Sequence, residues 1–199
     1  MAKLKLTKNE LKKQKDSLKR FKRYLPTLML KKQQLQAEIR LLEIRANEVI
    51  LEKKRVDESF KKWTAVFGET GFFTSDILRI TSIRTREGNI AGVPIPVFDG
   101  AEFEMAKYDL IETPLWLDVA AENMKKALHL DLEIQVLEEQ RRLLRKELQT
   151  TSQRVNLFEK VKIPEAKSNI KKIDVYLGDQ QTAAVVRGKI SKRGMEKAS

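Results

Sequence analysis

The 199-residue sequence contains no cysteine and a single histidine, His129. Without cysteine there can be no disulfide framework, thiolate metal site or cysteine nucleophile, and one histidine is too few for a histidine-ligated metal centre or a histidine-based triad. No apolar run approaches the roughly 20 residues that span a bilayer. The first 15 residues alternate lysine with leucine and lack the apolar core of a signal peptide. These absences favour a soluble protein of a reducing compartment, and we interpret His129 as a solvated helix residue.

Aromatic residues (7%), glycine (8 residues) and proline (5 residues) are also scarce, whereas charged residues make up 34% of the chain. Ordinary globular domains contain about 25% charged residues, so this composition favours long helices over a sheet-rich core. The formal net charge of +12 is unevenly spread, with +11 in residues 1–62, −4 in residues 63–115 and +5 in residues 116–199. Basic ends often bind nucleic acid or anionic lipid, but if these ends fold side by side they form one basic tip.

A heptad repeat runs through the first 63 residues. Fourteen of its eighteen a and d positions are apolar, which is typical of a coiled coil. Pro26 lies inside the repeat and predicts a kink rather than a helix end, because the heptads resume in register. A second apolar stripe runs from Trp116 to Phe158, and Pro164 predicts a kink after it. The predicted seam residues are Leu18, Leu25, Leu28, Leu35, Ile39, Leu42, Val49, Ile134, Leu137, Leu144, Leu148 and Val155.

The middle of the sequence predicts a short β-hairpin. Residues 77–86 are rich in isoleucine and threonine and alternate between two faces, and the Glu-Gly-Asn sequence at 87–89 is a turn signal. Residues 90–98 form a second extended run, which Pro94 and Pro96 confine to the edge of a sheet. This hairpin either packs back on the nearby helix ends, or presents part of its apolar surface to a partner and tunes turnover.

We therefore expect a mainly all-α fold, a long antiparallel two-helix coiled coil with a short β-hairpin in the middle. Neither amphipathic helix can bury its stripe alone, so each needs the other. The expected parts are a helix over residues 1–66, a glycine- and proline-rich middle over 67–112 with the hairpin at about 77–98, and a second helix over 113–199. The basic tail from Gly188 is expected to fray.

No residue pattern predicts a catalytic, metal or cofactor site. A phosphate loop ending at Gly188-Lys189 would need glycine at 183 and serine or threonine at 190, where the sequence has alanine and isoleucine. Lys32, Lys53 and Arg141 occupy seam positions, where they either set the helix register or extend their charged ends to solvent. The basic cluster at residues 19–23 is a solvated face, a protein contact or a nucleic-acid site. Candidate partner contacts are Ile83, Arg84, Arg86, Ile90, Val93, Lys12, Arg20 and Arg23.

Two segments resemble a known family. Residues 25–35, with the sequence LPTLMLKKQQL, are similar to the leucine-rich early helix of the D subunit of V-type and A-type ATPases and ATP synthases. Residues 154–164, with the sequence RVNLFEKVKIP, are similar to the more specific R-V-N-x-[LF]-E-x-x-x-I-P signature of the same family. The residues that match this signature are Arg154, Val155, Asn156, Glu159, Ile163 and Pro164.

This resemblance implies a central-stalk rotor shaft without an active site or cofactor. The family's protein stands inside a hexamer of alternating catalytic and non-catalytic subunits, with its paired termini in the bore. Its middle end binds a small rotor partner, the F subunit, and seats in a socket subunit above a membrane ring. The implied function is to couple proton or other ion flow through the ring to ATP synthesis or hydrolysis. The implied location is cytoplasmic and peripheral to the membrane, with no membrane span and no nucleic-acid partner.

Other classes of protein share parts of this pattern. A prefoldin-like chaperone also places a β-hairpin between two long helices, but its helix tips expose apolar residues, whereas the tip here is basic. A nucleic-acid-binding coiled coil would use the same basic tip and show steeply salt-dependent duplex binding. A coiled coil on a membrane surface fits less well, because the basic residues are not opposed by a wide apolar face.

Overall fold

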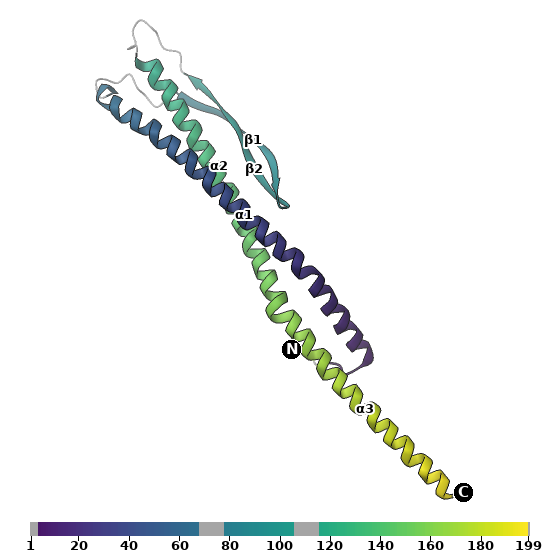
Figure 1. Ribbon diagram of the computed structural model, residues 1–199. Helices are drawn as coiled ribbons and strands as arrows, with labels where there is room; N and C mark the ends of the chain where they lie inside the picture. The colour runs from purple at the N-terminus through teal and green to yellow at the C-terminus, as the bar shows by residue number, and fades with distance from the viewer. Residues whose placement is uncertain (1–3, 68–77, 106–115, 199) are drawn as a thin grey trace. The chain divides into compact units, whose positions relative to one another are not determined.

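The computed structural model describes residues 4–67, 78–105 and 116–198. The helices are α1 (Lys8–Phe67), α2 (Trp116–Asn156) and α3 (Ile163–Ala198), and a π-helical segment, η1 (Leu157–Lys162), joins the last two. Strands β1 (Leu78–Ile90) and β2 (Val93–Met105) form one antiparallel hairpin between the helices in the sequence (Figure 1). The predicted fold class is confirmed, whereas the expected start of the second helix, at residue 113, lies outside the described residues.

The chain divides into two compact units. The hairpin unit is Gln33–Gln149 and holds the second half of α1, both strands and most of α2. The terminal unit combines Met1–Lys32 with Thr150–Ser199, and so holds the first half of α1, the end of α2, η1 and α3.

Helix α1 begins at a capped terminus and passes through its proline. The Glu10 amide donates to the Thr7 hydroxyl oxygen at 3.3 Å, which satisfies one of the donors that a helix start leaves unpaired. Pro26 lacks an amide hydrogen, yet the helix continues beyond it to Phe67, as the uninterrupted heptads predict. Beside the proline, the Thr27 hydroxyl donates to the Tyr24 carbonyl at 2.8 Å.

The hairpin turns at a different place from the predicted one. Ala91 and Gly92 have φ values of 51° and 78°, which is the two-residue turn that matches the twist of antiparallel strands. The Gly92 amide also donates to the side-chain oxygen of Asn89 at 2.9 Å. The turn predicted at residues 87–89 is therefore wrong, since those residues lie inside β1. Strand β2 continues to Met105, beyond the predicted limit of 98.

Two bulges interrupt the alternation that the sequence predicts for this region. Thr81 has no opposite residue in the register, and neither does Asp99 on the other strand. Glu102 holds the first bulge from across the hairpin. Its carboxylate accepts hydrogen bonds from Ser82 at 2.9 Å and from Arg84 at 3.1 Å, and its carbonyl accepts one from Thr81 at 3.0 Å. The bulges therefore compensate each other, and the register near the turn equals the register at the strand ends.

The core of the hairpin unit consists of two apolar clusters. In the first, the hairpin tip packs on both helices, and its buried residues are Leu35, Ile39, Val93, Ile95 and Leu144. In the second, the helices pack on each other through Val49, Leu130 and Leu137. Of the two alternatives for its apolar surface, the tip of the hairpin packs back on the helices, and it lies along the helix pair (Figure 1) rather than at the helix ends. Burying each such leucine or isoleucine side chain contributes about 1.5–3 kcal/mol.

In the terminal unit, the helical pattern changes before Pro164. The Ile163 amide bonds to the Phe158 carbonyl five residues earlier, so the turn is wider than an α-helical turn. Proline explains this form, because its ring clashes with the carbonyl four residues back and its nitrogen has no hydrogen to donate. The kink expected here is thus a π-helical segment. The expectation that the tail frays from Gly188 is wrong, since α3 continues to Ala198.

Candidate interaction surfaces

None of the twelve predicted seam residues is exposed. Six are buried and six are half-buried. The buried ones are Leu35, Ile39, Val49, Leu137, Leu144 and Val155. The half-buried ones are Leu18, Leu25, Leu28, Leu42, Ile134 and Leu148.

Two arginine–glutamate pairs join α1 to α2 beside the seam. Arg45 contacts Glu133 at 3.0 Å, and Arg145 contacts Glu43 at 2.7 Å. Glu43 lies two residues before Arg45 on α1, but its partner lies twelve residues after Glu133 on α2. If both ion pairs ran perpendicular to the axes of these antiparallel helices, their partners on α2 would also be two residues apart. The two pairs therefore slant in opposite directions along the helix axes. Sliding one helix past the other in either direction would lengthen one of the two ion pairs.

Lys53 forms a third link between the helices. Its ammonium group donates to the Asp131 carboxylate, and this hydrogen bond raises the pKa of Lys53 above the ordinary value of 10.5. Partial burial opposes the shift, and the charges of Asp131 and Asp57 add to it. The sequence left two roles for Lys53, which were to set the register of the helices or to extend its charge to solvent. Its contact with Asp131 on the other helix favours the first role. Arg141, by contrast, pairs with Glu138 on its own helix at 3.8 Å.

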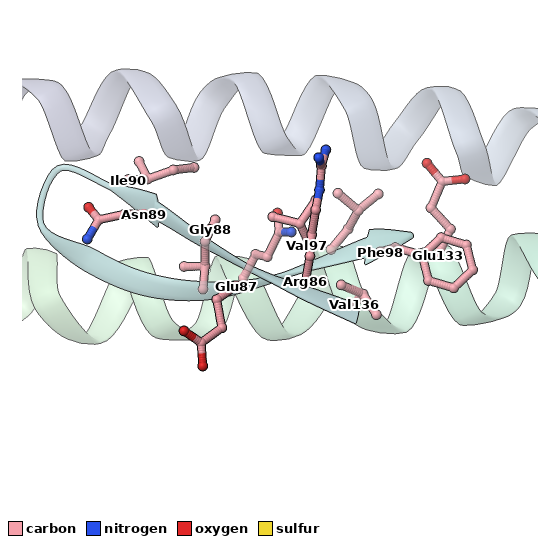
Figure 2. Close-up of a pocket in the computed structure, with 12 residues that line it drawn as sticks. Arg86, Glu87, Gly88, Asn89, Ile90, Val97, Phe98, Glu133 and Val136 are labelled. Carbon is pink, nitrogen blue, oxygen red and sulfur yellow. The ribbon is translucent and has the colours of Figure 1, made fainter. Parts of the chain in front are cut away.

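A cleft of 460 Å³ lies between the hairpin and α2 (Figure 2). Asn89 and Ile90 lie at its turn end, and Phe98 and Glu133 lie at the other end, as Figure 2 shows. Beside the cleft, the Gln140 side chain is only 5% exposed and donates to the Pro96 carbonyl, which fastens β2 to α2. No signal in the sequence pointed to this hydrogen bond.

The hairpin candidates for partner contact fall into two groups. Val93 is buried and Ile90 is half-buried, and both pack in the cluster that joins the hairpin to the helices. Ile83 is 49% exposed, and Arg84 and Arg86 are also exposed, with Arg84 paired to Glu102. The apolar surface at the hairpin tip therefore belongs to the fold, and the three exposed candidates lie on β1.

Aromatic contacts hold the rest of the hairpin against α2. The ring of His129 packs edge-on against Phe98 with 4.9 Å between ring centroids, so the interpretation of this half-buried histidine as a solvated residue is wrong. Further along, the Lys125 ammonium lies 5.8 Å from the centre of the Phe103 ring. The only sign of these contacts in the sequence was the presence of Phe98 and Phe103 in or near the segment predicted to be extended.

The terminal unit also pairs its helices in opposite directions. Phe21 packs against Phe158 with 5.2 Å between ring centroids and the rings tilted by 42°, and Lys15 lies 3.6 Å from Asp174. Thr151 and Ile173 are among its buried residues. The predicted contact residues Lys12, Arg20 and Arg23 are exposed on this unit, with Arg20 and Arg23 one turn apart on the same helix and Lys12 two turns before Arg20.

The RVNLFEKVKIP motif, residues 154–164, includes the π-helical segment and the residues on either side of it. Val155 is buried and Ile163 is half-buried, so these two anchor the motif in the terminal unit. The other four motif residues are exposed, namely Arg154, Asn156, Glu159 and Pro164. The motif therefore combines an unusual backbone turn with an exposed polar surface.

The described residues contain no group of three or more histidine, aspartate or glutamate side chains placed to hold a metal ion. Within the same ranges, no helix is both long enough and apolar enough to cross a membrane. The paired helices, the ion pairs between them and the hairpin laid along them define a helical-hairpin protein that offers surfaces for contact.

Comparisons with known proteins identify the family. The family model for the ATP synthase D subunit matches residues 10–193. The V-type ATP synthase D subunit of Borreliella burgdorferi is 53% identical over 197 residues, which cover 99% of this chain and 97% of that protein. The D subunits of Chlamydia pneumoniae and Chlamydia caviae are 35% and 31% identical, with 97% of this chain covered in both cases and 93% and 94% of theirs. The chain belongs to the ATP synthase D-subunit family, whose members in V-type ATP synthases are structural and not catalytic.

Proposed function

We propose that this chain is the central-stalk rotor shaft of a V-type ATP synthase and couples ion flow through a membrane ring to ATP synthesis or hydrolysis. The observation that supports this function most directly is the match to the D-subunit family along nearly the whole chain. The helix pair of the hairpin unit suits the role, because it has two apolar clusters and ion pairs that oppose sliding in both directions. A shaft has to resist such sliding if torque applied at one end is to reach the other.

The partners we propose are the catalytic and non-catalytic subunits of the hexamer, the small rotor F subunit and a socket subunit above the ring. An asymmetric helix pair presents a different face to each surrounding subunit. It can favour one conformation of a catalytic subunit only through a difference in binding free energy between conformations. Exposed basic residues such as Lys12, Arg20 and Arg23 suit the bore, since solvated ion pairs contribute only about 0–1 kcal/mol each and permit movement. The complex would lie on the cytoplasmic side of the membrane.

Native purification from the source cell tests this assignment. A tagged chain should recover the catalytic ATPase subunits together with a small partner subunit, and the recovered complex should hydrolyse ATP. The same purification at raised salt is the control for the basic surface, because nucleic acid bound through phosphates is released steeply as salt increases. Recovery of nucleic acid or of unfolded client proteins, without ATPase subunits, would contradict the proposal.

A further inference from the structure

The outer strand of the hairpin is unusually open. Nine of the thirteen residues of β1 are exposed, against five of thirteen in β2. The sheet has only two strands, and no other described segment pairs with the far edge of β1. An exposed strand edge offers a row of backbone donors and acceptors to any extended chain of suitable sequence.

The turn determines which backbone groups point outward. In a hairpin with a two-residue turn, the residues that flank the turn exchange both hydrogen bonds, and alternate pairs then exchange none. Ile90 and Val93 flank this turn. Counting back along β1, the amides and carbonyls of Thr85, Glu87 and Asn89 therefore face away from β2.

The opposite edge of the hairpin is closed. The residues paired with Asn89 and Glu87 are Pro94 and Pro96, which have no amide hydrogen to donate outward. The carbonyl of Pro96 accepts a hydrogen bond from the buried Gln140 of α2, so this acceptor on the edge of β2 is already occupied. Strand β1 contains no proline along its thirteen residues, and the backbones of Thr85, Glu87 and Asn89 form no hydrogen bond with another described element.

The side chains along the open edge indicate the chemistry of the occupant. Strand β1 carries three arginines and one glutamate, whereas β2 carries three acidic residues and no basic one. Arg86 is exposed and forms no ion pair with the described residues, and it leaves β1 in the opposite direction from Glu87 (Figure 2). Ile83 adds an apolar side chain that is 49% exposed. The bulge at Thr81 and the second register shift, between Arg84 and Thr85, leave residues 85–90 as the regular stretch.

We propose that the outer edge of β1, over residues 85–89, binds an extended acidic segment of a partner subunit as a third strand. Five residues of strand span about 17 Å, and Thr85, Glu87 and Asn89 each offer an outward amide and carbonyl to the segment. Arg84 is already paired with Glu102, so Arg86 is the arginine that can pair with an acidic side chain of the segment, and the backbone of β1 supplies the hydrogen bonds. The inference rests on the proposed function only in placing the partner within the ATP synthase assembly.

A proline substitution tests the contribution of the backbone hydrogen bonds separately from that of the side chains. Glu87→Pro removes one outward amide without removing a bond of the hairpin, as Pro96 does on the opposite strand. Glu87→Thr is the matched control, because it removes the same charge and keeps the amide. In both variants, the inward amides of Gly88 and Ile90 should remain protected, which shows that the hairpin is still folded.

Hydrogen–deuterium exchange at single-residue resolution, on the free chain and on the purified ATPase complex, is the test. The amides of Thr85, Glu87 and Asn89 should exchange rapidly in the free chain and at least tenfold more slowly in the complex. Glu87→Pro should abolish the slowing at Thr85 and Asn89, and Glu87→Thr should keep it.

Three results would overturn the inference. The first is equal exchange of these amides in the free chain and in the complex. The second is slowing in the free chain that grows with its concentration, because the edge then pairs with a second copy. The third is a chain that never enters the ATPase complex, and this result contradicts the proposed function as well. The first two results overturn the inference about β1 but leave the proposed function intact, so the two kinds of failure are distinguishable.

Discussion

Leu144→Ala should be among the most destabilising single changes in the hairpin unit. The Leu144 side chain is 0% exposed and belongs to the cluster in which both helices and the hairpin meet. Truncating a buried leucine costs about 2–5 kcal/mol, from lost burial and from the cavity that remains. Because three elements line this position and limit its collapse, we expect about 3–5 kcal/mol. For a chain of this size that corresponds to a fall in Tm of roughly 6–20 °C.

The assay is unfolding by urea and by heat, followed by far-ultraviolet circular dichroism. Leu41→Ala is the matched control, because the chemical change is the same and Leu41 is 60% exposed on α1. The control should cost no more than about 0.5 kcal/mol. If the two variants unfold within about 0.5 kcal/mol of each other, the packing described for this cluster is wrong.

Three further predictions concern the turn, the hairpin and the lysine link. Ala91→Asn should slow exchange of the hairpin amides about fivefold, because a left-handed φ costs alanine about 1–2 kcal/mol and the Asn-Gly pair favours this turn; unchanged exchange would contradict the turn. Gly88→Ala should cost about 1–3 kcal/mol in urea unfolding, since its Cβ would lie 2.6 Å from Cγ2 of Val97, and the added change Val97→Ala should relieve that overlap. The raised pKa of Lys53 means that its stabilising contribution is complete below the ordinary pKa of 10.5 and is lost as pH rises through the folded-state pKa. The stability difference between wild type and Lys53→Met should therefore shrink in urea titrations above pH 10.5, and a constant difference would refute the pair.

The helices and their seam could be predicted from the sequence because they depend on local periodicity. Heptad spacing placed Leu35, Val49 and Leu144 on the inner face of their helices, and each is buried. The same spacing leaves the axial register of two helices undetermined, since a shift of seven residues preserves the pattern. The links that depend on register, such as Arg45 with Glu133, were therefore not predictable.

The hairpin shows why a local turn signal can mislead. Glu-Gly-Asn at 87–89 and Ala-Gly at 91–92 are both acceptable turn sequences, and the first is the more familiar kind. Tertiary packing selects the second, because it brings Val93 and Ile95 onto the helices. Gly88 is then needed inside the strand for the close approach of Val97, a role that the sequence alone does not reveal.

Pro164 illustrates a partial prediction. The loss of its amide hydrogen and the clash of its ring predict an irregularity in the helix. Whether the chain bends sharply, ends or widens its turn depends on the residues packed around it, including the contact between Phe21 and Phe158.

A reversible cross-link tests the shaft function most directly. The natural chain has no cysteine, so a single cysteine at the exposed Arg20 is unique and can form a disulfide with one cysteine introduced into a catalytic subunit of the complex. If the chain turns inside the hexamer, oxidation should stop ATP turnover and reduction should restore it, while the complex with Arg20→Cys alone keeps its turnover throughout. Full ATP turnover in a complex shown to be cross-linked would contradict the proposal that this chain is the rotor.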